Sequence, residues 1–185
     1  MFCLDEKSHI QALARLDPVL PLSPGRLERH GFEYFRHGTL SLYAALDTIN
    51  GTVLRKTVKR PTSDELVAFL KELLDTQPRN REIHVILDNL SAHKSAKVRA
   101  FLEETPRLAL HFTPTYSSWL NQVEIWFAKI ERDVIARGVF TSTADLSKKI
   151  MRYIRRYNRN ARPICWSYND PRQRILASDS SLTSH

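Results

Sequence analysis

The segment HVILD, residues 84 to 88, most constrains how this chain can fold. Its run of Val, Ile and Leu predicts a strand in the middle of a sheet, because strands covered on both faces are almost continuously apolar. Asp88 ends the run, so its carboxylate is expected at the carboxyl edge of a central strand. Open α/β sheets place their chemistry at that edge.

Further strands are predicted on both sides of this segment. Residues 1–5 form a short strand that ends at Asp5, and residues 40–47 and 52–58 form a hairpin around the Asn50-Gly51 turn. A fifth strand covers residues 108–112. Residues 6–40 are rich in Pro and Gly and are expected to be mostly loop, with a helical turn over residues 10–16.

Four helices complete the prediction. One is capped at Thr62 or Ser63, ends near Asp75, and has an apolar stripe of leucines and Phe69. The others span residues 94–104, Ser117 or Ser118 to about residue 137, and residues 142–160. The last of these is capped by Ser142 and has an apolar stripe of Leu146, Ile150, Tyr153, Ile154 and Tyr157. The order predicts an α/β fold with a mixed five-stranded sheet flanked by helices, in one domain over residues 1–175 followed by a disordered polar tail at 176–185.

Three acidic residues can form one site on this fold. Asp5 and Asp88 end strands, and Glu124 lies at the border of the apolar stripe of its helix, from which it can reach the sheet edge. Taken singly, either aspartate is more simply explained as a cap of the next turn. Together they supply the oxygen ligands that Mg²⁺ or Mn²⁺ prefers, and two such ions can assist phosphodiester cleavage.

The composition favours a polyanionic partner. The formal net charge is +8 and the sequence pI is about 9.7, which is typical of proteins that bind nucleic acid, although such charge can also serve solubility alone. Phosphate contacts are expected from the last helix and from the segment after Asp5, with a solvated charged face as the alternative. The candidate residues are Arg15, Arg26, Lys94, Lys148, Lys149, Arg152, Arg155 and Arg156.

Three strings resemble the DDE transposases, in particular the insertion sequence 630 group of the mariner-like superfamily. They are CLDEKSHIQALAR, HVILDNLSAHKS and FTPTYSSWLNQVEIWFAKIER, with 35 residues between Asp88 and Glu124. The resemblance implies a ribonuclease H-like fold and a catalytic metal-binding triad of Asp5, Asp88 and Glu124. It also implies supporting roles for Asn89, His93 and Asn121, where His93 can equally be an ordinary helix cap. Trp119 matches the family too, but core packing explains it as well.

The resemblance implies cleavage of DNA strands and their transfer to a target, with transposon ends and target DNA as partners. The family's helix-turn-helix modules precede the catalytic domain, and Met1 stands only four positions before Asp5, so those modules are expected to be absent. The alternative is an inactive truncated remnant that only binds DNA or dimerises, with itself or with a full-length transposase.

Two further expectations concern the environment of the protein. Cys3 and Cys165 lie far apart in sequence and are predicted to be free buried thiols in a reducing compartment. No apolar stretch approaches the roughly 20 residues of a membrane span, so a cytoplasmic protein that associates with the nucleoid when bound to DNA is expected.

Overall fold

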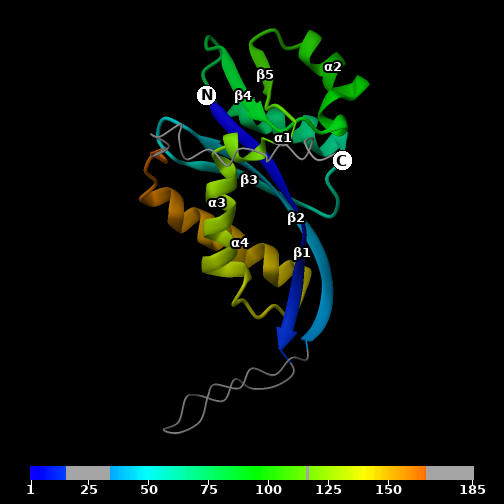
Figure 1. Cartoon of the computed structure of the whole chain (residues 1–185), viewed down its shortest axis with the longest axis vertical. Coiled ribbons are helices and arrows are strands. Elements are labelled where there is room, and N and C mark those ends of the chain that lie inside the picture. The colour runs from blue at the N-terminus through cyan, green and yellow to red at the C-terminus, as the bar shows by residue number, and fades with distance from the viewer. Residues whose placement is uncertain (16–33, 116, 166–185) are drawn as a thin grey trace, which may run out of the picture.

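The computed structural model describes residues 1–15, 34–115 and 117–165. These residues form a five-stranded sheet in the order β3-β2-β1-β4-β5 (Figure 1). Strand β1 (Phe2–Arg15) lies at the centre, antiparallel to β2 (Tyr34–Asp47) and parallel to β4 (Ile83–Leu87). The edges are β3 (Val53–Val58), antiparallel to β2, and β5 (Leu108–Phe112), parallel to β4. The predicted mixed five-stranded sheet is therefore confirmed.

Helices cover both faces of the sheet, each over its own hydrophobic core. On one face, α1 (Ser63–Asp75) and α2 (Ala96–Glu103) cover a core that includes Leu4, Phe69 and Val85. On the other face, α3 (Val123–Ile130) and α4 (Thr143–Arg159) cover a core that includes Cys3 and Trp126. Since alternate residues of a strand point to opposite faces, neighbours on β1 contribute to different cores.

The helix caps act as the sequence indicates. The Thr62 side chain accepts a hydrogen bond from the Glu65 amide at 3.2 Å, and Ser142 accepts one from the Asp145 amide at 3.0 Å. These contacts satisfy amides that a helix leaves unpaired in its first turn. The predicted stripe of α1 is buried throughout. In the predicted stripe of α4, Leu146, Ile150 and Ile154 are buried, whereas Tyr153 and Tyr157 are half-buried.

The prediction for residues 6–40 was wrong over the described part of that segment. Instead of a loop with a helical turn, β1 continues to Arg15 and β2 begins at Tyr34 (Figure 1). The pairing shifts register between Lys7 and Ile10 and again between Gln11 and Leu13, and His9 has a positive φ of 55°. Such bulges break the alternation of apolar and polar residues by which a strand is identified. Residues 16–33 and the predicted tail at 176–185 lie outside the described residues.

Two predicted helices begin later than expected. A 3-10 turn, η1 (Ser91–Lys94), precedes α2, and Ser95 caps α2 by accepting from the Val98 amide at 3.4 Å. A second 3-10 turn, η2 (Ser118–Leu120), precedes α3, which continues into a π-helical segment, η3 (Glu131–Ile135). The single predicted helix from Ser117 or Ser118 to residue 137 is thus three consecutive elements.

Two predictions about individual side chains also need correction. Cys3 is buried as expected, whereas Cys165 is exposed. Trp119 is 56% exposed, so it does not belong to either core. It lies in η2, the short turn before α3. Among the described residues, no helix is both long and apolar enough to cross a bilayer.

Gly51 should be essential to the hairpin between β2 and β3. Its φ is +76°, and a Cβ at this position would collide with the carbonyl oxygen of Arg162. Replacing Gly51 with Ala combines left-handed backbone strain of about 1–2 kcal/mol with a backbone clash. We expect Gly51→Ala to lower the free energy of unfolding in urea by at least about 2 kcal/mol. An unchanged unfolding midpoint would contradict this packing of the segment after α4 on the hairpin.

Candidate active site

The site forms where β1 runs beside the carboxyl end of β4. Phe2 and Cys3 pair with Val85 and Ile86, so the chain leaves β4 directly beside Asp5. Asp88 follows the last residue of β4, as predicted. Asp5, in contrast, does not end a strand: it lies inside β1, paired with Ala44 of β2, and is 5% exposed. The central strand thus carries a buried carboxylate in its middle.

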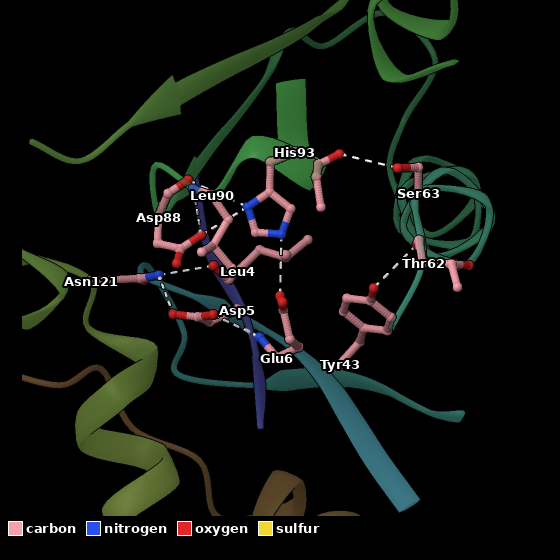
Figure 2. A network of polar contacts seen from close by, with 11 residues as sticks. Leu4, Asp5, Glu6, Tyr43, Thr62, Ser63, Asp88, Leu90, His93 and Asn121 are labelled. Carbon is pink, nitrogen blue, oxygen red and sulfur yellow. Dashed lines mark hydrogen bonds and ion pairs between the residues drawn. The ribbon is translucent and has the colours of Figure 1, made fainter. Parts of the chain in front are cut away.

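Helix α3 carries the third carboxylate, Glu124, whose charge acts on Asp5. The backbone of Gln122 and Val123 lies against the thiol of Cys3, two residues from Asp5 on the same face of β1. Asn121 is fully buried, and its amide donates to the Leu4 carbonyl at 2.8 Å and to Asp5 Oδ2 at 3.3 Å (Figure 2). Glu124 lies in the first turn of α3 and is half-buried. Asn121 therefore connects the start of α3 to β1 beside Asp5.

The electrostatics of Asp5 are those of a group that lacks a counter-charge. The pKa of Asp5 is raised to about 8, chiefly by burial, and the charges of Asp88, Glu6 and Glu124 add to the rise. The Glu6 amide, which donates to Asp5 Oδ1 at 2.8 Å, opposes it. Within the described residues, no Lys or Arg forms an ion pair with Asp5, Asp88 or Glu124. A cation placed among these carboxylates would relieve the repulsion.

His93 joins Asp88 to a residue that the sequence reasoning missed. The ring is 2% exposed, with Nδ1 2.8 Å from Asp88 Oδ1 and Nε2 3.2 Å from Glu6 Oε2 (Figure 2). Because carboxylates only accept hydrogen bonds, both ring nitrogens can donate only when His93 is protonated. Burial alone would lower the pKa of His93, but the bond to Glu6 and the charges of Glu6 and Asp88 raise it overall.

Glu6 could not be distinguished from an ordinary surface acid in the sequence. It follows Asp5, so on a strand it must point to the opposite face, toward α1, where Tyr43 and Thr62 also lie. The side chain of His93 spans from that face to Asp88. The only signal for Glu6 in the sequence was its position next to Asp5 in FCLDE. Because the strand was predicted to end at Asp5, Glu6 was assigned to a loop instead of to the opposite face of β1.

The other predicted residues are more widely distributed. Asn89 is exposed and donates to Thr115 Oγ1 at 3.3 Å, so its side chain does not orient Asp88. The Lys94 ammonium lies 4.9 Å from the centre of the Phe112 ring. On α4, the Lys149 ammonium donates to Asp145 at 2.8 Å and to the Val139 carbonyl at 2.7 Å. The remaining cations of α4 are exposed: Lys148, Arg152, Arg155, Arg156 and Arg159.

Two of the predicted DNA contacts cannot be placed. Arg15 is the last residue of β1, and Arg26 lies outside the described residues. Lys149 pairs with Asp145, whereas the exposed cations of α4 form no ion pair within the described part of the chain. They remain predicted phosphate contacts.

The donors at this site suit a hard divalent ion. Asp5, Asp88 and Glu124 offer carboxylate oxygens, and the side-chain oxygen of Asn121 is a buried acceptor with no hydrogen-bond donor among the described residues. The described side chains do not, however, already gather three His, Cys, Asp or Glu groups closely enough to hold an ion. The chemistry of the donor set fits Mg²⁺ or Mn²⁺, and the free carboxylate of Glu124 is the group that would complete it.

The sheet order and helix placement are those of the ribonuclease H-like catalytic fold of transposases, and the sequence comparison agrees. Residues 1–147 match the model of the DDE superfamily endonuclease family. Because the match covers most of the chain, the protein belongs to the DDE endonuclease superfamily. It is also 28% identical over 113 residues to the "Insertion element IS630 uncharacterized 39 kDa protein" of Shigella sonnei, across 61% of this chain and 33% of that protein.

Solved structures of Mos1 transposase share the fold. The catalytic domain of Mos1 mariner transposase superposes with a TM-score of 0.56 at 17% identity, over 83% of this chain and 69% of that one. The Mos1 mariner paired-end complex with Mn superposes with a TM-score of 0.65 at 18% identity, over 86% of this chain and 49% of that one. The chain therefore spans about a third of the length of its curated relative and about half of the Mos1 chain in that complex.

The raised pKa of Asp5 predicts how stability depends on pH without divalent ions. Between about pH 4 and pH 8 the unfolded chain has lost the Asp5 proton while the folded chain retains it. Because the unfolded state then binds fewer protons, the free energy of unfolding should fall as the pH rises through this window. Asp5→Asn removes the buried charge, so in EDTA it should stabilise the protein at pH 8 by about 1–3 kcal/mol.

The control for this experiment is Asp64→Asn. The Asp64 side chain is 70% exposed on α1 and pairs with the exposed Lys97, so its replacement should change the pH profile little. Urea unfolding at several pH values measures both variants. If Asp5→Asn were destabilising at pH 8, the Asp5 carboxylate would be favourably compensated in the folded protein, contrary to the geometry described above.

Proposed function

We propose that this chain is the catalytic domain of a DNA transposase that cleaves DNA strands and transfers them to a target, using a divalent metal held by Asp5, Asp88 and Glu124. The observation that carries the proposal is the buried Asp5 carboxylate, which is close enough to Asp88 and Glu124 to feel their charges and which no Lys or Arg of the described residues contacts in an ion pair. A divalent ion among these carboxylates would offset the repulsion that adds to the raised pKa of Asp5.

Each side chain has a defined part in this proposal. Asp5, Asp88 and Glu124 would hold Mg²⁺ or Mn²⁺, and two ions are expected. When bound, such ions polarise the phosphoryl group and stabilise the leaving oxygen. Asn121 restrains Asp5 from the start of α3, and His93 holds Asp88 in one orientation. Glu6 acts through His93, because it contacts the far nitrogen of the ring.

The similarity to known transposases supports a nucleic acid substrate. One Mos1 structure is described as a paired-end complex with the left transposon end, and it superposes on this chain with a TM-score of 0.63 at 19% identity. The net charge of +8 suits such a partner. Exposed cations on α4 and Lys94 would contact phosphates, without reading sequence.

Removing one carboxylate should abolish cleavage. We expect Asp88→Ala to reduce nicking of supercoiled plasmid by at least about 100-fold, because even residues behind the metal ligands of an enzyme typically contribute 10–100-fold. Calorimetric titration with Mn²⁺ should show weakened binding in the same variant. Asp64→Ala is the matched control, since it removes an exposed acid from α1 and should leave both measurements unchanged.

The same assay distinguishes the alternative of a non-catalytic remnant. DNA binding that does not depend on metal, with no nicking by the wild-type chain in Mg²⁺ or Mn²⁺, would leave only a DNA-binding role. Nicking that survives Asp88→Ala at the wild-type rate would instead place the chemistry elsewhere on the molecule or in a contaminant.

The contact between His93 and Asp88 should tune metal binding more than folding. His93→Gln retains one polar group but cannot bridge Glu6 and Asp88, so Mn²⁺ affinity and nicking should fall about 10–100-fold. Glu6→Gln keeps a hydrogen-bonding partner for His93 and should cost less than His93→Gln in both measurements. A His93→Gln variant that unfolds earlier in urea yet binds Mn²⁺ as tightly as wild type would show that His93 serves only stability.

A further inference from the structure

A groove of about 490 Å³ lies between α3 and the end of α4, separate from the carboxylate site. Trp126 of α3 and Tyr157 of α4 form part of its lining, with ring centroids 6.1 Å apart in an edge arrangement. Lys129, Arg132 and Arg162 are the charged residues of the lining. The groove thus joins aromatic side chains to three cations.

The charge of the groove favours an anionic ligand. Of the described residues that line it, none is acidic. The nearest acid in contact is Asp133, which lies 3.0 Å from Arg132 Nε and 3.4 Å from the Lys129 ammonium. The Asp133 carboxylate is therefore shared between Lys129 and Arg132, and Arg162 forms no ion pair within the described residues. A surface with this excess of positive charge attracts phosphate groups.

The aromatic part of the groove favours a ligand with flat rings as well as acceptors. Tyr157 is half-buried and stacks on Tyr153 with centroids 6.4 Å apart. The indole Nε1 of Trp126 is a buried donor without an acceptor in the described part of the chain. Trp126 is only 1% exposed, so the aromatic ring open to a ligand is that of Tyr157. A nucleotide offers phosphate oxygens, polar base edges and a ring for stacking.

The position of the groove along α3 connects it to the candidate active site. Ala128, which lines the groove, lies four residues after Glu124, and residues i and i+4 lie on the same side of a helix. Ile125, Lys129 and Arg132 then follow along the neighbouring stripe of α3 and η3. The part of the groove on α3 therefore begins at the residue next to Glu124.

We infer that this groove holds a single DNA strand running from the cleaved phosphate, with phosphates on Arg132 and Arg162 and a base against Tyr157. The inference rests on the proposed function for the direction of the strand. A single strand fits better than a duplex because only unpaired bases can place their faces on an aromatic side chain. The groove therefore differs from the exposed cations of α4, which can contact either form.

The test is fluorescence anisotropy with labelled single-stranded and blunt duplex oligonucleotides, in EDTA so that no cleavage occurs. The double variant Arg132→Gln/Arg162→Gln should weaken single-strand binding about tenfold and make its salt dependence shallower by about 0.7 per lost phosphate contact. Tyr157→Leu should also weaken single-strand binding, by about tenfold, with the salt dependence unchanged because no charge is lost. Duplex binding should change less than twofold in each case.

The matched control is Arg79→Gln/Arg99→Gln, which removes the same charge from exposed positions after α1 and on α2. Equal losses in the control and groove variants would overturn the inference, as would an equal loss of duplex affinity. Nicking by the wild type and its loss in Asp88→Ala are measured separately. Intact nicking with an unaffected groove variant refutes only the groove, whereas absent nicking with a selective loss of strand binding refutes only the proposed activity.

Discussion

The pairing of β1 with neighbours of opposite direction is the constraint on which the site depends. Antiparallel β2 and parallel β4 fix β1 from both sides, so Asp5 cannot move away from the chain that leaves β4. The same strand contributes Leu4 to the core under α1 and α2, and Cys3 to the core under α3 and α4. Hydrophobic burial of these neighbours therefore holds a carboxylate where solvation alone would not place it, because desolvation of the charged form is unfavourable.

Residues on both faces of the sheet position the carboxylates of Asp5 and Asp88. On the α3 face, Asn121 fixes the backbone of Leu4 and contacts Asp5 itself. On the α1 face, Glu6 meets His93, which reaches Asp88 (Figure 2). The consecutive residues Asp5 and Glu6 of β1 thus contact side chains on opposite faces of the sheet. Packing draws the negative charges together, and the His93 ring, whose pKa is raised by Glu6 and Asp88, lies between those two carboxylates. Among the described residues, neither Asp5 nor Glu124 forms an ion pair with a Lys or Arg.

The sequence predicted the parts of the fold that have local signals. Caps at Thr62 and Ser142 and the apolar stripes of α1 and α4 depend on neighbours within one or two turns, and the structure confirms them. The second half of β1 has no such signal, because bulges near His9 and Ala12 disturb its alternation and its strand character comes from pairing with β2. Asp5 was consequently expected at a strand end, and Glu6 was not recognised.

The candidate site shows the same division between local and long-range information. Asp88 could be placed because an apolar strand precedes it, and Glu124 because helical periodicity puts it beside the apolar stripe of α3. The partner of His93 could not be deduced, since Glu6 lies 87 residues away and only the parallel pairing of β1 and β4 brings the two together. Side chains such as Asn89, adjacent in sequence to Asp88, face elsewhere. Proximity along the chain is therefore a poor guide to which residues restrain a carboxylate, whereas strand order and the alternation of faces decide it.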